Sequence, residues 1–269
     1  MYKYTKVNMR NFYSFSSGTL IGTLGGLIGL GGAEFRLPLL NIVFKFDLKS
    51  AIILNIAISL VTVCFAFVFR IFEADLNLLA SYIFIVFFIL CGSLYGSYVG
   101  ASLVSKVDKE LLKRIVFVLL LGLGILLVAH SYIENGFYLG LPLIGNFILS
   151  VICGYFIGLI SSLLGVAGGE LIIPTIMIIY GVDIKLAGTL SLLISIPTLI
   201  VGIYKYKQKT NLLPLSENKT FIKYMAFGSI LGALIGVYLL GSVNSEYLVL
   251  FLGVLLIVSA FKILVIKKV

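Results

Sequence analysis

The chain contains two copies of one glycine-rich motif, and each copy interrupts a long apolar segment. The first copy is Gly29-Leu-Gly-Gly-Ala-Glu-Phe-Arg-Leu-Pro38, and the second is Gly165-Val-Ala-Gly-Gly-Glu-Leu-Ile-Ile-Pro174. Their glutamates lie 136 positions apart (170 − 34). A broken apolar segment that occurs twice is more typical of membrane transporters than of enzymes, because two repeats can then form one site between them.

The same offset of 136 holds without gaps well beyond the motif. It pairs Gly18 with Gly154, Gly22 with Gly158, Asp47 with Asp183, Lys49 with Lys185, Ser59 with Ser195, Gly92 with Gly228, and Glu110 with Glu246. We therefore predict an internal duplication. Its parts are a tail at residues 1–14, repeat 1 at residues 15–133, a connecting loop at residues 134–142 and repeat 2 at residues 143–269.

Composition places almost the whole chain in a lipid bilayer. Hydrophobic residues make up 61% of the chain, charged residues 12%, and the mean hydropathy is +1.18. Polar side chains could not cover so much apolar surface in water. The net charge of +9 is accounted for by basic residues in cytoplasmic loops, so no nucleic-acid partner is expected. The three cysteines show no CxxC spacing, and we expect no disulfide framework, metal site or cofactor.

Eight apolar segments can be marked, and most have the roughly 20 residues that a helix needs to cross the hydrocarbon. They cover residues 15–44, 50–69, 78–104, 111–128, 143–180, 186–204, 224–240 and 247–265. The first and the fifth segments are longer and contain the glycine-rich breaks. Each of these two either crosses once as a broken helix or enters and returns as a re-entrant hairpin of two half-helices.

The distribution of basic residues favours the hairpins, because lysine and arginine concentrate on the cytoplasmic side of a membrane. Single crossings would leave 12 basic residues on one side and 7 on the other, whereas two hairpins give 17 and 2. Each repeat then contains three crossings besides its hairpin, so the second repeat enters the membrane inverted. The predicted fold is all-α and polytopic, with two inverted repeats in the cell membrane and both termini in the cytoplasm.

The two breaks predict an anion site at the interface of the repeats. Non-helical backbone inside a membrane is tolerated only where protein or a wet cavity surrounds it. Glycine permits positive φ and close backbone approach, and the half-helix after each break begins with free N–H groups and the positive end of its dipole. The residues expected to bind substrate are Gly29, Gly31, Gly32, Ala33, Glu34, Arg36, Asn55, Gly165, Gly168, Gly169, Glu170 and Ser191.

The charged members of this set each have two interpretations. Glu34 and Glu170 are the only acids well inside the apolar segments. They either take up and release protons during transport or cap the orphan donors of their half-helices. Arg36, whose counterpart is Ile172, either binds substrate asymmetrically or snorkels to the membrane interface.

Polar and small residues recur at helical spacing on the flanking segments. One polar stripe lines a cavity or forms interhelical hydrogen bonds; it comprises Asn55, Ser59, Thr62, Ser191, Ser195 and Thr198. Glycines spaced by four predict close helix packing; they are Gly92, Gly96, Gly100, Gly228, Gly232 and Gly236. Asp47 and Asp183 are predicted to be helix N-caps.

The paired motifs, each followed by a helix that begins at Asp47 or Asp183, resemble those of the sulfite exporter TauE/SafE family of membrane permeases. The resemblance covers roughly residues 18–265, and each copy carries one alanine in the pattern, Ala33 in the first and Ala167 in the second. It implies transport of a small sulfur-containing anion, such as sulfite, thiosulfate or an organosulfonate, linked to protons.

A passive anion channel is the alternative that the same features support. A membrane enzyme is less well supported, because the chain has one histidine and neither an HExxH nor a GxSxG motif. The expected partners are the bilayer, a small anion and protons. The sequence leaves open which anion is carried, the direction of transport, the coupling ion and the oligomeric state, a homo-oligomer included.

Overall fold

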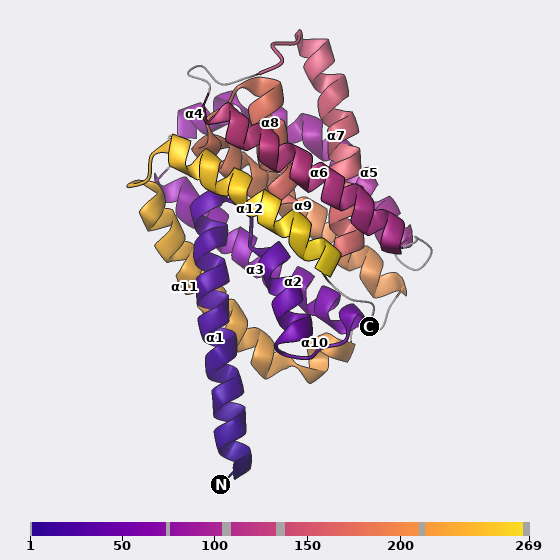
Figure 1. Ribbon diagram of the computed structural model, residues 1–269, viewed down its shortest axis with the longest axis vertical. Helices are drawn as coiled ribbons and strands as arrows, with labels where there is room; N and C mark the ends of the chain where they lie inside the picture. The colour runs from indigo at the N-terminus through magenta and orange to yellow at the C-terminus, as the bar shows by residue number, and fades with distance from the viewer. Residues whose placement is uncertain (1, 74–75, 104–108, 133–137, 210–212, 266–269) are drawn as a thin grey trace.

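The computed structural model describes residues 2–73, 76–103, 109–132, 138–209 and 213–265, which form twelve helices and no strand (Figure 1). The first half contains α1 (Tyr2–Ile28), α2 (Ala33–Ile42), α3 (Leu48–Glu73), α4 (Leu76–Ser81), α5 (Ile83–Leu103) and α6 (Lys109–His130). The second half contains α7 (Leu143–Leu164), α8 (Gly169–Tyr180), α9 (Ile184–Lys209), α10 (Leu213–Glu217), α11 (Lys219–Leu240) and α12 (Ser245–Val265).

Five helices, namely α3, α5, α7, α9 and α11, are long and apolar enough to cross a membrane by their length and composition. The described apolar parts of α6 and α12, Arg114–His130 and Ser245–Phe261, are shorter. The prediction of an all-α polytopic membrane protein is confirmed. The predicted tail is not separate from the first segment, because α1 already begins at Tyr2. Most of the predicted connecting loop, residues 133–137, lies outside the described residues.

Each pair of half-helices forms a hairpin whose two ends lie together. In the first hairpin, the guanidinium of Arg10 in α1 lies 5.2 Å from the ring centroid of Phe46, just beyond α2. In the second, the hydroxyl of Tyr180 at the end of α8 is 2.7 Å from that of Ser150 in α7. The chain therefore turns back on itself at each break.

The two hairpins open toward opposite ends of α11. Phe46, beyond the first hairpin, packs edge-on against Phe221 at the start of α11. Gly181, beyond the second, lines a cavity together with Leu240 at the other end of α11. The two hairpins therefore open in opposite directions along α11, while their inverted entry into a membrane stays a prediction.

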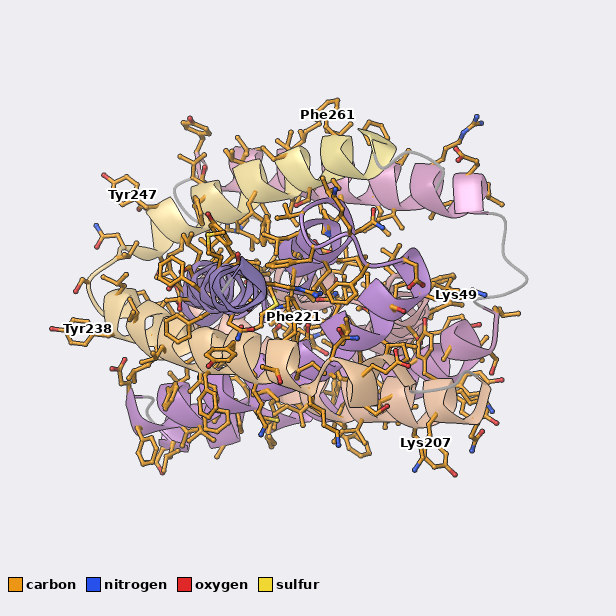
Figure 2. The ribbon with its side chains drawn as sticks, turned by 90° about the horizontal axis from the view of Figure 1, so that it is seen from below. Lys49, Lys207, Phe221, Tyr238, Tyr247 and Phe261 are labelled. Atoms are coloured by element: carbon orange, nitrogen blue, oxygen red, sulfur yellow. The ribbon has the colours of Figure 1, made fainter. Side chains whose placement is uncertain are left out.

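The two ends of the bundle can also be told apart when the molecule is viewed from below. Figure 2 shows Lys49 and Lys207 toward one side of the view, and Tyr238 and Tyr247 toward the opposite side. Both lysines belong to the basic set predicted to face the cytoplasm. The two tyrosines flank a loop predicted to face the other way. Tyr238 is 75% exposed and Tyr247 67% exposed, which suits aromatic side chains at a membrane interface.

Glycines spaced by four allow helices from different halves to pack closely. α1 packs along α11, and α5 packs along α7. A Cβ on Gly232 would collide with the backbone oxygen of Thr19, and one on Gly96 with that of Tyr155. The packing role predicted for these glycines is confirmed. The two halves are consequently interlocked, since the closest helix pairs each join one helix from either half.

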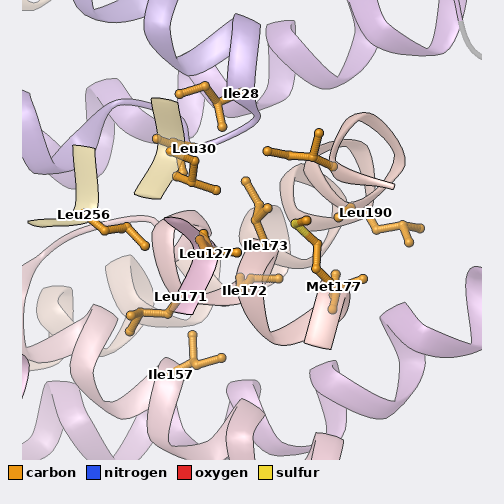
Figure 3. Packing of buried hydrophobic residues seen from close by; sticks show 14 of the residues in the cluster. Ile28, Leu30, Leu127, Ile157, Leu171, Ile172, Ile173, Met177, Leu190 and Leu256 are labelled. Atoms are coloured by element: carbon orange, nitrogen blue, oxygen red, sulfur yellow. The ribbon is translucent and has the colours of Figure 1, made fainter. Parts of the chain in front are cut away.

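The first break and the start of α8 lie in a buried cluster of apolar side chains (Figure 3). Leu30 from the first break and Ile172 and Ile173 from α8 belong to it. Leu127 of α6 and Leu256 of α12, which pack against each other as a helix pair, contribute from one side. Val166 and Ala167 of the second break belong to a second buried cluster, which also contains Ile56 and Val63 of α3.

Both predicted helix caps are present. Oδ2 of Asp47 accepts a hydrogen bond from the N–H of Ser50 at 3.1 Å, and Oδ1 of Asp183 accepts one from the N–H of Lys185 at 2.8 Å. Hydrogen bonds from the Ser50 side chain and backbone hold the pKa of the Asp47 carboxyl below its ordinary value. The caps therefore begin α3 and α9 immediately after the two hairpins.

Candidate anion site

Both breaks adopt backbone conformations that favour glycine. In the first, φ is 97° at Gly29, 76° at Gly31 and 70° at Gly32. In the second, φ is 70° at Gly165 and 79° at Gly168. A side chain in this left-handed region brings Cβ too close to the following carbonyl oxygen. These five positions therefore depend on glycine for their conformation.

The two breaks are packed against each other. A Cβ on Gly169 would lie 2.9 Å from Cα of Leu30 and 3.1 Å from the carbonyl oxygen of Gly29. One on Gly31 would lie 3.4 Å from Cβ of Ala167. Gly169 is the first residue of α8 and has no positive φ. Gly169 therefore contributes by letting the backbone of α8 approach the first break closely.

Two side chains of the predicted polar stripe tie each hairpin to the other half. Nδ2 of Asn55 donates hydrogen bonds to the carbonyl oxygens of Gly165 at 2.8 Å and Ala33 at 3.0 Å. The hydroxyl of Ser191, the counterpart of Asn55, donates to the carbonyl oxygen of Gly29 at 3.1 Å. Gly29 and Gly165 are also counterparts. The hydrogen bond from Asn55 to Gly165 is therefore equivalent to the one from Ser191 to Gly29.

These contacts favour one of the two interpretations of the polar stripe. Asn55 and Ser191 are fully buried, and Ser195 also bonds to backbone, donating to the carbonyl oxygen of Ala167 at 3.1 Å. The stripe thus holds the backbone of the breaks through interhelical hydrogen bonds. Oδ1 of Asn55 has no hydrogen-bond partner among the described residues, so one acceptor remains at the place where the hairpins meet.

Arg36 is buried inside the bundle, so the interpretation that it snorkels to the interface is wrong. Its side chain is 0% exposed. Nη1 donates to the hydroxyl of Ser59 at 2.8 Å, and Nη2 donates to those of Thr62 at 3.1 Å and Ser229 at 3.3 Å. Arg36 also interacts electrostatically with Glu34. A guanidinium surrounded mainly by neutral hydroxyls keeps much of its positive charge uncompensated.

The second half replaces this cation by an apolar side chain. Ile172 takes the position of Arg36 and belongs to the apolar core. The counterparts of two Arg36 partners, Thr198 and Ser93, are hydrogen-bonded directly to each other at 3.1 Å. Arg36 bridges the hydroxyls of Thr62 and Ser229. The equivalent hydroxyls of Thr198 and Ser93 bond to each other with no guanidinium between them.

Glu34 and Glu170 lie in the first turns of α2 and α8. Glu34 is half-buried, and Glu170 is 4% exposed. The two carboxyl groups are close enough to interact electrostatically. The N-cap residues, Gly32 and Gly168, have no side chain to offer the helix ends. Oε2 of Glu170 has no hydrogen-bond partner within the described part of the chain, so this oxygen does not cap α8.

The structure adds residues that the sequence analysis did not single out. Ser229 completes the set of hydroxyls around Arg36, although it lies 193 positions away in the chain. Arg70 and Tyr206 are buried at the ends of α3 and α9. The offset of 136 pairs Ser93 with Ser229 and Arg70 with Tyr206. The alignment of the two repeats could therefore have drawn attention to these four positions.

The charged groups gathered here are one guanidinium and two carboxyl groups, beside the N-termini of two half-helices. A guanidinium and helix N-termini bind anions, while neighbouring carboxyl groups can exchange a proton. Within the described ranges, no group of three or more His, Cys, Asp or Glu side chains could hold a metal ion. The guanidinium and the helix N-termini are therefore suited to binding an anion.

The similarity to known proteins covers most of both halves of the chain. The sequence model described as Sulfite exporter TauE/SafE matches residues 3–127 and 150–269. A probable membrane transporter protein of Methanocaldococcus jannaschii is 26% identical over 194 residues, which cover 70% of this chain and 69% of that protein. No solved structure matches the chain. With its doubled motif, its apolar helices and a family match on both sides of the connecting loop, the chain belongs to the sulfite exporter TauE/SafE family and is a multi-pass membrane transporter.

Proposed function

We propose that the protein is a secondary transporter of a small anion, a sulfur oxyanion or an organosulfonate, coupled to protons across the cell membrane. The observation that carries the proposal is the buried guanidinium of Arg36. Its Nε has no hydrogen-bond partner among the described residues, so it retains a donor for a ligand. A cation inside a membrane bundle is usually found facing a cavity or a charged group, and Arg36 interacts with Glu34 while Nε stays available for a transported anion.

The class of anion follows from the donors around the breaks. A sulfite, thiosulfate or sulfonate group presents several acceptor oxygens, which match the planar donors of a guanidinium and the N–H groups of a helix N-terminus. The N-termini of α2 and α8 meet where the breaks pack together. The description of the family as sulfite exporters supports this choice of substrate.

Glu34 and Glu170 are the proposed proton carriers. They interact with each other, and one oxygen of Glu170 lacks a partner among the described residues. Moving a net charge through hydrocarbon is unfavourable. A proton that travels with the anion reduces this net charge, and a carboxyl beside the anion site is well placed to load and release it.

The closed contact between the breaks supports a transporter over a passive channel. Gly29, Leu30 and Gly169 approach backbone to backbone, and Asn55 and Ser191 tie this contact together. An anion can pass only if the hairpins move relative to the flanking helices, as alternating access requires. A channel would instead need a continuous pore.

Uptake by proteoliposomes tests this function. Radiolabelled sulfite, thiosulfate and taurine would be offered to purified protein under an imposed pH gradient. We expect saturable accumulation that depends on the gradient. Glu34→Gln and Glu170→Gln should still bind the anion but lose gradient-driven accumulation, while Glu246→Gln, an exposed acid outside the site, should behave as the parent. Normal accumulation by both site variants would refute the coupling role, and uptake that ignores the gradient and does not saturate would indicate a channel.

The proposed orientation places both termini in the cytoplasm. Cysteines introduced at Lys49 and Lys207 should resist an impermeant thiol reagent added outside intact cells, whereas one at Tyr247 should react. The background would lack Cys64, Cys91 and Cys153. Labelling of position 49 or 207 from outside, with a cytoplasmic control protein protected, would refute this orientation.

A further inference from the structure

A cavity of about 450 Å³ lies at the end of the bundle toward which the second hairpin opens. Its wall is formed by the end of α3, α4 and the residue that follows it, the residues after α8, the start of α9 and the end of α11. The residues with charge or hydrogen-bonding capacity in it are Arg70, Glu73, Tyr82, Asp183, Lys185 and Thr189. No residue of the anion site at the breaks contributes to this wall, so the cavity is a separate place.

Arg70 is buried in the wall and joins three helices. It is 2% exposed, and all five of its N–H groups are used. Nε and Nη2 donate to the carbonyl oxygen of Gly26 at 3.1 and 2.9 Å, and Nη2 also to that of Leu27 at 2.9 Å. Nη1 donates to the carbonyl oxygen of Lys185 at 2.9 Å and the hydroxyl of Thr189 at 3.1 Å. The guanidinium from α3 thus connects the C-terminal end of α1 to α9.

Gly188 allows α9 to come this close. A Cβ at this position would lie 2.7 Å from Nη1 of Arg70 and would collide with the carbonyl oxygen of Ile28, the last residue of α1. The first break begins at the next residue, Gly29. The contact between Arg70 and α9 therefore closes the bundle directly beside the anion site.

The other end of the molecule closes without a charge. Tyr206, the counterpart of Arg70, donates a hydrogen bond from its hydroxyl to the carbonyl oxygen of Ser162 at 2.9 Å. Ser162 is the counterpart of Gly26. Tyr206 thus holds α9 to α7 much as Arg70 holds α3 to α1. The contact at Arg70 is thus made by a cation, and the contact at Tyr206 by a neutral hydroxyl.

We propose that this cavity is an access site for a small oxyanion, which draws Nη1 of Arg70 away from Lys185 and Thr189 and thereby releases α9 from α1. The proposal rests on the proposed transport of an anion but concerns a different place and step. The two acceptors that Nη1 now uses are neutral, and an anionic acceptor forms the stronger hydrogen bond. Nε and Nη2 can keep their contacts with α1, so the release is confined to α9.

Two carboxyl groups limit how tightly an anion binds there. Glu73 interacts electrostatically with Arg70, and Asp183 is engaged in capping α9 through the N–H of Lys185. The ammonium group of Lys185 is the second cation of the wall. With two basic and two acidic residues, the cavity favours weak and reversible binding, which suits a passing substrate.

The test asks whether sulfate, an inert oxyanion, opens this end of the protein. The reporter is Ser191→Cys in a full-length protein whose three native cysteines are replaced by serine. Position 191 is buried next to Gly29, so an impermeant thiol reagent reaches it only after α9 moves. Labelling from the Arg70 face of sealed vesicles is compared in sulfate and in chloride at equal ionic strength, which keeps screening constant. We expect labelling in sulfate to be faster on the order of tenfold, because two neutral hydrogen bonds are released.

Three variants of this reporter sharpen the result. Thr189→Val removes one acceptor with little change in side-chain volume and should label roughly fivefold faster without sulfate. Arg70→Gln should label rapidly in both salts. Tyr206→Phe is the matched control at the opposite end, and it should leave labelling from the Arg70 face unchanged. Slow labelling in both salts, combined with slow labelling of Thr189→Val, would overturn the proposal.

Transport by the cysteine-free parent, measured in parallel, separates this inference from the proposed function. If the parent accumulates anions but labelling does not respond to sulfate, the access site is refuted and the transport function stands. If sulfate accelerates labelling but the parent carries none of the tested anions, the access site is supported and the proposed function is refuted.

Discussion

The two halves of the molecule share a backbone plan but differ in their buried charges. Each half forms a hairpin at a glycine-rich break, and each sends a polar side chain to the break of the other. The first half, however, places Arg36 and Arg70 in the interior, where the second half has Ile172 and Tyr206. The features that the two halves share therefore form the fold. The residues that differ between them are the buried arginines to which we assign a function.

The comparison also indicates that the elements of one half can form without a buried cation. A guanidinium inside a bundle is costly to bury. The second half forms the same elements with an isoleucine in the position of Arg36. We infer that the charge of Arg36 serves the anion.

Arg36→Ile makes the first half resemble the second and should have the largest effect. Hydrogen bonds to a charged group are among the strongest that a site offers, so anion uptake should fall by at least about a hundredfold. The protein should remain folded, because Thr62 and Ser229 can pair as Thr198 and Ser93 do. Proteoliposome uptake and thermal unfolding in detergent measure the two effects.

The matched control for Arg36→Ile is Ile172→Val, a small apolar change at the counterpart position, which should transport almost normally. Uptake by Arg36→Ile at the rate of the parent would show that the two halves are equivalent in function as well as in backbone.

Gly29→Ala and Gly165→Ala should differ although the two glycines are counterparts. Both have positive φ, which costs an alanine roughly 1–2 kcal/mol. A Cβ on Gly29 would lie 2.5 Å from the backbone oxygen of Gly188, whereas one on Gly165 would lie 2.5 Å from Cγ2 of Ile52. A side chain can rotate away and a packed backbone cannot, so Gly29→Ala should be the less stable by roughly 2 kcal/mol more. Equal melting temperatures in detergent would contradict this asymmetry.

Asn55→Ala and Ser191→Ala compare the two ties between the hairpins. Asn55 donates two hydrogen bonds to the breaks, and Ser191 donates one. At roughly 1 kcal/mol for each neutral hydrogen bond, Asn55→Ala should lower the free energy of unfolding about twice as much as Ser191→Ala. Ser81→Ala is the control, because its hydroxyl bonds only within an exposed helix. Equal losses at positions 55 and 191 would mean that the carbonyl of Ala33 gains nothing from Asn55.

The features predicted from sequence are those that act locally or through the bilayer. Glycine, proline and basic residues each have a structural preference that does not depend on their neighbours. Because the sequence is duplicated, each preference appears at two equivalent positions. The breaks, the hairpins and the caps at Asp47 and Asp183 follow from these preferences.

Contacts between distant parts of the chain could not be predicted in this way. Hydropathy does not distinguish a buried arginine from one that snorkels, because both lie in an apolar segment, so the position of Arg36 required the structure. Its contact with Ser229 depends on how α1 and α11 pack. The role of Asn55 as a tie to Gly165 depends on the meeting of two breaks that lie far apart in the sequence.

The smallest effect is expected at the helix caps. Asp47→Ala removes the oxygen that accepts the N–H of Ser50 and should lower the free energy of unfolding by about 1 kcal/mol. Hydrogen bonds from Ser50 lower the pKa of Asp47 in the folded protein. Its contribution is therefore complete above the unfolded-state pKa of about 3.9 and is lost as the pH falls through the lower folded-state value. Detergent unfolding of parent and variant should differ at about pH 7 and converge once the pH falls below the lowered folded-state pKa. A difference that persists when the carboxyl is protonated would assign the cap to backbone geometry rather than to the carboxylate.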